Sequence, residues 1–308
     1  MHTILGANGV IGVEVSRELS RQGRKVRQVS RHPQRVSDSD ALVVADLLDP
    51  QATSRAVAGS ETAYLVVGLK YDARVWEEQW PRIMSNVIEA CRTHRARLVF
   101  FDNVYAYGRV EGPMTEETPF NPCSRKGEVR ARIATMLLEA MRAGHLEALI
   151  ARAADFYGPR AVLSLTHSTV FQRLARGKKP QWVGSLEARH SFTYTPDAGR
   201  AVAVLGQTPT AFGETWHLPT SNEPMSGERL TRLACELAGK PYSVQVAPRW
   251  VLRLMGRFVP VLRENEEMMY QLEHDYVFSS AKIESRLGLS PTDYRTGIAE
   301  TLSWAQAS

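Results

Sequence analysis

The sequence has few cysteines and no long apolar run, and both features exclude whole classes of protein. Its three cysteines, Cys91, Cys123 and Cys235, are widely spaced, so they indicate neither a disulfide framework nor a paired-cysteine metal site. No apolar stretch approaches the roughly 20 residues that a membrane-spanning helix needs, and we expect no membrane partner. The motifs of zinc proteases and serine hydrolases are also missing, so we expect no metal centre.

The net charge is +5, and the basic residues form one local cluster between positions 21 and 35. The members of this cluster are Arg21, Arg24, Lys25, Arg27, Arg31 and Arg35. Either they form a solvated surface or they lie near a site for an anionic ligand. A nucleic-acid partner is not expected, because no aromatic residues are interleaved with the basic ones. The first motif begins at Gly6, which leaves no room for a leader peptide, so we expect a cytoplasmic protein.

The first half of the chain alternates short apolar runs with helical patterns. The apolar runs predict strands at residues 3–5, 25–29, 41–45, 63–67, 98–101 and 148–151. The intervening patterns predict helices at residues 10–21, from 50 onward, 80–94 and 127–143. Apolar strands separated by helices are typical of a parallel sheet that is covered on both faces. The sequence therefore predicts an α/β fold, a Rossmann-type doubly wound parallel sheet with a smaller C-terminal substrate lobe.

Two domains follow from this pattern. We expect residues 1–154 to form the dinucleotide-binding domain, with residues 191–219 returning to it. Residues 155–190 and 220–308 are expected to form the substrate lobe. Within that lobe, the basic and apolar stretch Arg249–Phe258 predicts a helix that packs over the lobe, and a membrane-surface helix is the alternative.

A glycine-rich loop lies between the first strand and the first helix. It reads Gly6-Ala-Asn-Gly9-Val-Ile-Gly12, and its position is the one that a dinucleotide-binding loop requires. The helix that follows offers free N–H groups and a partial positive charge to phosphates. We therefore expect a pyrophosphate here, bound by Gly6, Asn8, Gly9, Val10, Ile11 and Gly12.

The end of the second strand bears on the choice of cofactor. An acidic residue at this place usually binds the ribose hydroxyls of NAD, whereas this chain has Ser30 and Arg31. An arginine suits the 2′-phosphate of NADP, so we expect NADP, with NAD less favoured. The alternative is that Arg31 merely points into solvent.

Several further motifs resemble the extended short-chain dehydrogenase/reductase superfamily, the NAD(P)-dependent epimerase/dehydratase group. The segments that show this resemblance are Asp46-Leu47, Val66-Val67-Gly68, Asn86–Ala90, Val104–Gly108, Arg152–Pro159, Phe192–Asp197 and Ser279–Lys282. The resemblance covers nearly the whole chain. It implies that Asp46, Leu47, Val67 and Gly68 also line the cofactor.

The catalytic motif of that superfamily, Tyr-x-x-x-Lys with a serine or threonine, is missing. None of the ten tyrosines is followed by a lysine four residues later. By register, the family's tyrosine, lysine and serine fall on Lys126, Arg130 and Asn103. Two proton donors stay open: Tyr105, if Lys126 or Arg130 stabilises its anion, and Lys126 itself, if burial favours its neutral form. We take Tyr105, Lys126 and Asn103 as the catalytic candidates, against the alternatives of an aromatic packing residue and a solvated helical turn.

Three other residues are candidates for substrate contact: Lys70, Arg130 and His190. For His190 the alternative is a surface histidine that is satisfied by a partner. The resemblance also implies a homodimer through the helices at 80–94 and 127–143, although the sequence alone does not demand one.

These features leave two functions open. The first is an NADP-dependent oxidoreductase or epimerase-like enzyme that acts on a small hydroxyl or carbonyl substrate, for example a sugar-nucleotide-like one. The second is a catalytically silent NADP-binding sensor or regulator on the same fold. The missing triad favours the sensor, whereas the retained lobe and the polar residues after the fifth strand favour the enzyme.

Overall fold

The computed structural model describes residues 1–247 and 264–308, so the predicted helix Arg249–Phe258 lies outside the described residues. The chain divides into two compact units. Unit 1 comprises Met1–Ala106, Arg125–Arg152 and Ala198–Leu218, and unit 2 comprises Tyr107–Ser124, Ala153–Asp197 and Pro219–Ser308. These units assign residues 107–124, 153–154, 191–197 and 219 differently from the predicted domains. The roles of cofactor and substrate domain remain predictions.

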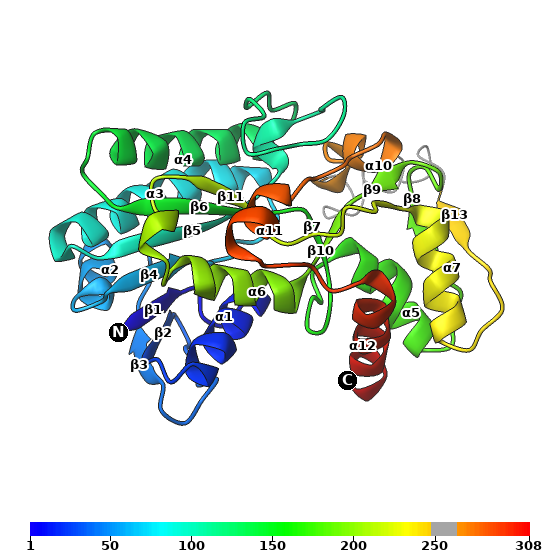
Figure 1. Cartoon of the computed structure of the whole chain (residues 1–308), viewed down its shortest axis with the longest axis horizontal. Helices are drawn as coiled ribbons and strands as arrows, with labels where there is room; N and C mark the ends of the chain where they lie inside the picture. The colour runs from blue at the N-terminus through cyan, green and yellow to red at the C-terminus, as the bar shows by residue number, and fades with distance from the viewer. Residues whose placement is uncertain (248–263) are drawn as a thin grey trace. The chain divides into compact units, whose positions relative to one another are not determined.

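Unit 1 is built on a seven-stranded parallel sheet (Figure 1). Its strands are β1 (His2–Leu5), β2 (Val26–Ser30), β3 (Ala41–Val44), β4 (Thr62–Leu65), β5 (Arg97–Asn103), β6 (Ala148–Ala153) and β11 (Thr215–His217). They lie in the order β11-β6-β5-β4-β1-β2-β3, so the chain runs outward from β1 to one edge and then returns to β4 on the other side. This order confirms the predicted doubly wound α/β fold. Within the predicted returning segment 192–218, β11 pairs with β6 and joins the sheet, whereas residues 192–197 belong to unit 2.

Helices cover both faces of this sheet. They are α1 (Val10–Arg21), α2 (Pro50–Val57), α3 (Ala73–His94), α4 (Arg125–Arg142) and α6 (Thr195–Leu205). Helices α2, α3 and α4 pack side by side on one face, and α1 and α6 lie on the other (Figure 1). A Cβ on Gly199 of α6 would lie 2.1 Å from Glu14 of α1, so these two helices approach as closely as glycine allows.

Side-chain caps account for the starts of α2 and α3. Asp49 caps α2 by accepting hydrogen bonds from the N–H groups of Gln51 and Ala52, and Pro50 occupies the first helical position, as predicted. The predicted start of α3 at Trp80 is wrong. The helix begins at Ala73 because the Asp72 side chain caps it, and it continues through Pro81.

Unit 2 consists of short strands and helices around a core of its own. Its strands are β7 (Asp155–Tyr157), β8 (Gln181–Val183), β9 (Arg189–His190), β10 (Phe192–Tyr194), β12 (Met225–Ser226) and β13 (Gln245–Ala247). Its helices are α5 (Gln172–Ala175), α7 (Gly227–Leu237), α10 (Tyr270–Glu273), α11 (Ala281–Leu287) and α12 (Tyr294–Ala307). The core joins Phe171, Trp182, Leu230 and Ile298, all of them buried. None of the helices within the described residues is long and apolar enough to cross a membrane.

Candidate functional site

The glycine loop joins β1 to α1, and its three glycines differ in whether a side chain would fit in their place. Gly6 has a φ of +102°, and a Cβ there would lie 2.4 Å from the Cα of Val67. At Gly12 a Cβ would lie 2.9 Å from the carbonyl oxygen of Ala7, so the helix packs tightly against the loop. At Gly9, by contrast, the nearest atom to an added Cβ would be 3.5 Å away, an ordinary contact. The fold itself thus requires Gly6 and Gly12, whereas Gly9 leaves open space over the backbone.

That open space adjoins the N-terminus of α1. Gly9 is the N-cap of this helix, and no side chain among the described residues caps it. The first N–H groups of a helix point outward and favour an anion. Ile11 is buried, so only its main chain can take part. This end of the helix therefore fits the pyrophosphate of a dinucleotide.

The segment after β2 carries the exposed side chains of Arg31, His32 and Arg35. Ser30 supports this segment, because its Oγ accepts a hydrogen bond from the N–H of His32 at 3.1 Å. Asn8 reaches it from the glycine loop and bonds its main chain. The predicted cofactor residues Gly6, Asn8 and Arg31 thus belong to two loops that are joined to each other.

The remaining predicted cofactor residues follow β3 and β4. The Asp46 side chain is exposed and accepts a hydrogen bond from the N–H of Leu48 at 3.0 Å. Leu47 is buried, and its carbonyl oxygen accepts a hydrogen bond from the Asn86 amide at 2.9 Å. Val67 is half-buried and Gly68 is exposed. All four lie in unit 1, just beyond the carboxyl ends of their strands.

The carboxyl end of β5 carries the catalytic candidates Asn103 and Tyr105. The Oδ1 of Asn103 accepts a hydrogen bond from the N–H of Tyr105 at 3.1 Å, so the amide shapes the turn that follows the strand. The Tyr105 ring is stacked on Trp76 with centroids 6.3 Å apart. Its hydroxyl lies 3.4 Å from the hydroxyl of Tyr71. Tyr105 is therefore both a packing residue and a member of a hydroxyl pair.

Lys126 and Arg130 lie one turn apart on α4, on the side that faces the sheet. Lys126 is 0% exposed, and its Nζ lies 4.5 Å from the centroid of the Tyr71 ring. Arg130 is 7% exposed, and its guanidinium lies 4.3 Å from the Trp80 centroid and 4.9 Å from the Trp76 centroid. The alternative that these two residues form a solvated turn is wrong, because both are buried, Lys126 against Tyr71 and Arg130 against Trp76 and Trp80 of α3.

Asp102 connects this cluster to the sheet. Its carboxylate lies 3.4 Å from Arg130 and 2.9 Å from Arg152 at the end of β6, and all three side chains are buried. Burial lowers the pKa of the Arg130 guanidinium below its usual range, and the Asp102 carboxylate opposes that shift. The cluster of Tyr71, Trp76, Asp102, Tyr105, Lys126 and Arg130 combines two phenols with three buried charges.

A comparison with family models decides the classification. The model described as the NAD dependent epimerase/dehydratase family matches residues 2–218. The chain belongs to this family. The match confirms the resemblance to the extended short-chain dehydrogenases/reductases, and it covers the glycine loop, the strand ends and the buried cluster on α4.

Individual members of the family and solved structures agree with this assignment. The 3-diazoavenalumate denitrifying reductase of Streptomyces sp is 25% identical over 313 residues, 96% of this chain and 98% of that protein. The UDP-glucose 4-epimerase of Thermus thermophilus, in complex with NAD, superimposes with a TM-score of 0.82 at 19% identity over 100% of both chains. The dTDP-glucose 4,6-dehydratase of Streptomyces venezuelae, a double mutant with NAD and DAU bound, gives 0.82 at 18% identity over 99% of this chain and 96% of that one. At these identities the two structures show the shared fold.

The three candidates for substrate contact differ in burial and in their partners. Lys70 is exposed and its Nζ lies 3.8 Å from the Asp72 carboxylate, whereas Arg130 is buried in the cluster on α4. His190 belongs to unit 2 and is 2% exposed, so it is not a surface residue. Its Nε2 lies 3.0 Å from the Asp155 carboxylate and its Nδ1 lies 3.1 Å from the carbonyl oxygen of Gln271. His190 therefore ties three segments of unit 2 together.

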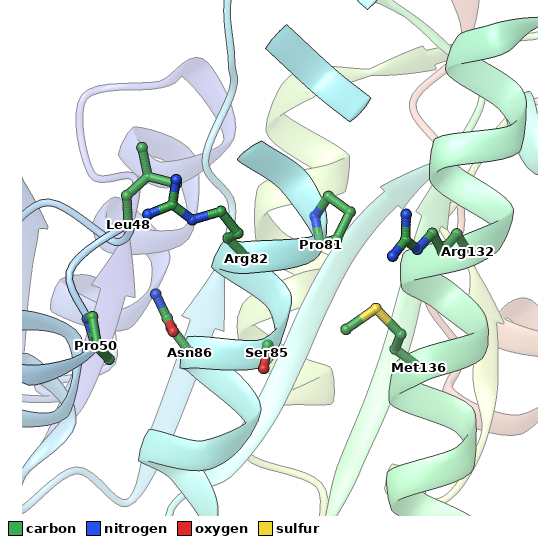
Figure 2. Close-up of a pocket in the computed structure, with 8 residues that line it drawn as sticks. All are labelled: Leu48, Pro50, Pro81, Arg82, Ser85, Asn86, Arg132 and Met136. Atoms are coloured by element: carbon green, nitrogen blue, oxygen red, sulfur yellow. The ribbon is translucent and has the colours of Figure 1, made fainter. Parts of the chain in front are cut away.

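A shallow groove of about 460 Å³ runs between the helices of one face of unit 1 (Figure 2). It is lined by Leu48, Pro50, Pro81, Arg82, Ser85, Asn86, Arg132 and Met136. None of the predicted site residues lines it. The groove lies on the helices that the sequence analysis associates with a homodimer, which stays a prediction.

Trp76 of the buried cluster, and Trp80 and Arg152 that contact it, were not predicted as site residues from the sequence. Trp76 and Trp80 are four residues apart on α3, so they lie on one helical face, and that spacing was a usable signal. Arg152 carries a charge at the end of an otherwise apolar strand, which was a second signal. Neither signal identifies Asp102 as the partner of the arginines, because that contact joins segments 28 and 50 residues apart.

Proposed function

We propose that this protein is an NADP-dependent oxidoreductase that acts on a small hydroxyl or carbonyl substrate. In this proposal Tyr105 and Lys126 replace the missing Tyr-x-x-x-Lys pair. The observation that carries it is the chain of contacts from the buried Lys126 to the Tyr71 ring and from the Tyr71 hydroxyl to the Tyr105 hydroxyl. A lysine without exposed surface, in contact with a phenol pair at the carboxyl end of β5, is an arrangement suited to moving a proton.

The cofactor side of the proposal rests on charge. The segment that follows β2 offers Arg31, His32 and Arg35 to a ligand, and it has no carboxylate at the place where NAD-binding chains usually have one. Arginine binds phosphate with two parallel hydrogen bonds, which favours the 2′-phosphate of NADP. When bound, the nicotinamide supplies or accepts the hydride.

The proton side of the proposal assigns separate tasks to the two candidates. Tyr105 is partly exposed, so its hydroxyl is the group that can touch a substrate oxygen and give it a proton during reduction. Lys126 is fully buried and acts through Tyr71, because a nearby cation stabilises the negative charge that proton transfer leaves on a phenol. Asn103 positions Tyr105 through the turn at the end of β5.

The relatives support a choice of reaction and substrate. The relative that is similar over 96% of this chain is named a reductase, which supports reduction. The structural neighbours named above act, by their names, on UDP-glucose and dTDP-glucose, which supports a small hydroxylated or carbonyl substrate. We therefore place a hydroxyl or carbonyl carbon, in a sugar nucleotide or a compound of similar size, at the reacting position.

Titration of the purified protein with NADPH and NADH, followed by nicotinamide fluorescence, tests the cofactor. We expect tighter binding of NADPH and a weaker NADPH complex in Arg31→Ala. Failure to bind either nucleotide would remove the basis of the proposal.

A screen of carbonyl compounds for NADPH oxidation then tests the chemistry. On a substrate found in this way, Tyr105→Phe and Lys126→Met should lower kcat while NADPH binding is retained. Unchanged turnover in Tyr105→Phe would remove Tyr105 from the proton transfer. Tight NADPH binding with no turnover on any compound would instead favour the silent sensor.

A further inference from the structure

We infer that Asn8 is a positioning residue that sets the preference for a 2′-phosphate by holding the basic loop 31–37 against the glycine loop. The inference rests on the proposed NADP site. It adds a residue whose side chain binds the loop and does not contact the cofactor.

The Asn8 side chain joins two loops that bind different parts of a dinucleotide. Its Nδ2 donates a hydrogen bond to the carbonyl oxygen of His32 at 2.6 Å. Its Oδ1 accepts one from the N–H of Gln34 at 3.3 Å. Both the nitrogen and the oxygen of the amide thus bond the main chain of the basic loop. The bonded residues are 24 and 26 positions away from Asn8 in the sequence.

Two other side chains complete the support of the basic loop. At its start, the Ser30 Oγ accepts a hydrogen bond from the N–H of His32 at 3.1 Å. At its end, Asp40 is buried, and its Oδ2 accepts hydrogen bonds from the N–H groups of Val36 at 2.9 Å and Ser37 at 3.0 Å. Among these supports, Asn8 alone comes from the glycine loop. It is therefore the one that fixes the basic loop relative to the pyrophosphate position.

This geometry predicts an effect that is confined to 2′-phosphorylated ligands. The pyrophosphate interacts with the N-terminus of α1, which does not depend on the Asn8 side chain. The 2′-phosphate interacts with Arg31 and its neighbours, whose placement does depend on it, because preorganised groups lose less entropy on binding. A side chain that instead contacted the shared part of the cofactor would affect NADPH and NADH alike.

The experiment compares Asn8→Ala with Asn8→Asp, which keeps the acceptor and loses the donor, and with Asn222→Ala, an exposed asparagine of unit 2, as the matched control. Dissociation constants are measured for NADPH and NADH, and for adenosine 2′,5′-bisphosphate and ADP by competition. We expect Asn8→Ala to weaken NADPH and adenosine 2′,5′-bisphosphate about threefold to tenfold, the value of one or two hydrogen bonds, and NADH and ADP by less than about twofold. Asn8→Asp loses the bond to the His32 carbonyl oxygen and adds a negative charge near the phosphates, so it should weaken NADPH binding at least as much as Asn8→Ala does, and Asn222→Ala should match the wild type.

A double-mutant cycle with Arg31→Ala tests the proposed NADP site and the role of Asn8 separately. If Asn8 acts through the basic loop, Asn8→Ala should have little further effect on NADPH binding in the Arg31→Ala background. Equal losses for NADPH and NADH, or an undiminished effect in that background, would overturn the role of Asn8. If Arg31→Ala itself leaves NADPH binding unchanged, the proposed NADP site fails. If Arg31→Ala weakens it and Asn8→Ala does not, only the inference about Asn8 fails.

Discussion

The guanidinium of Arg130 lies 3.4 Å from the carboxylate of Asp102, and both side chains are buried. The other oxygen of the same carboxylate lies 2.9 Å from the guanidinium of Arg152, so one acid serves two arginines from α4 and β6. Removing the charge of such an acid takes the carboxylate away from two buried guanidinium groups, which is far more costly than the loss of an exposed pair. The carboxylate of Asp102 is thus the electrostatic centre of the cluster beside Tyr105.

Replacing Asp102 with asparagine should therefore destabilise the protein strongly. We expect the free energy of unfolding to fall by roughly 3–5 kcal/mol, measured by urea denaturation. The control is Glu89→Gln, which breaks the exposed pair with Arg92 and should change the free energy of unfolding far less. Similar small changes in both variants would show that the buried pair does not stabilise the fold.

The glycine loop allows a test that separates folding from ligand binding. Gly9→Ala places a methyl group at ordinary contact distance from its neighbours, 3.5 Å from the Gly6 carbonyl oxygen, so the free energy of unfolding should change by no more than about 0.5 kcal/mol. The same methyl group lies where the backbone should meet the pyrophosphate, so NADPH binding should weaken roughly tenfold or more. Calorimetric unfolding and fluorescence titration measure the two effects on one sample.

Gly6→Ala is the matched control for Gly9→Ala. Its methyl group would lie 2.4 Å from the Cα of Val67, at a φ of +102°, so this variant should unfold at a clearly lower temperature. A Gly9→Ala protein that is stable and still binds NADPH normally would argue against the pyrophosphate position.

His2 should make the stability of the protein depend on pH. Burial lowers the pKa of the His2 imidazole from 6.5 to about 4, so the folded protein keeps it neutral where the unfolded chain takes up a proton. The contribution of neutral His2 to the free energy of unfolding is complete above about pH 6.5 and is lost as the pH falls toward 4. In His2→Gln, which can still hydrogen-bond Tyr64, the fall in unfolding free energy between pH 7 and pH 4 should be smaller than in the wild type. Parallel pH profiles for the two proteins would contradict this assignment.

The elements that sequence analysis predicted correctly depend on interactions within a few residues. The helix Val10–Arg21 has the predicted bounds because the glycine before it and the chain reversal at Gly23 are local features. The start of α2 at Pro50 follows from the side chain of Asp49, which caps the N–H groups two and three residues later in the chain. The predicted start of α3 was wrong because the capping residue, Asp72, lies before the stretch where the apolar pattern is clearest.

Residue identities alone specify the glycine loop, the order of strands and helices in the first half of the chain, and the fact that no tyrosine is followed by a lysine four residues later. These are facts of residue identity and short-range hydrogen bonding. The burial of Lys126 and Arg130, and the bonds from the Asn8 amide to the basic loop, became visible in the folded chain alone. Each depends on a segment tens of residues away: Tyr71 for Lys126, Asp102 for Arg130 and His32 for Asn8. A local pattern cannot specify them, because the burial of a charge is decided by which distant side chains pack around it.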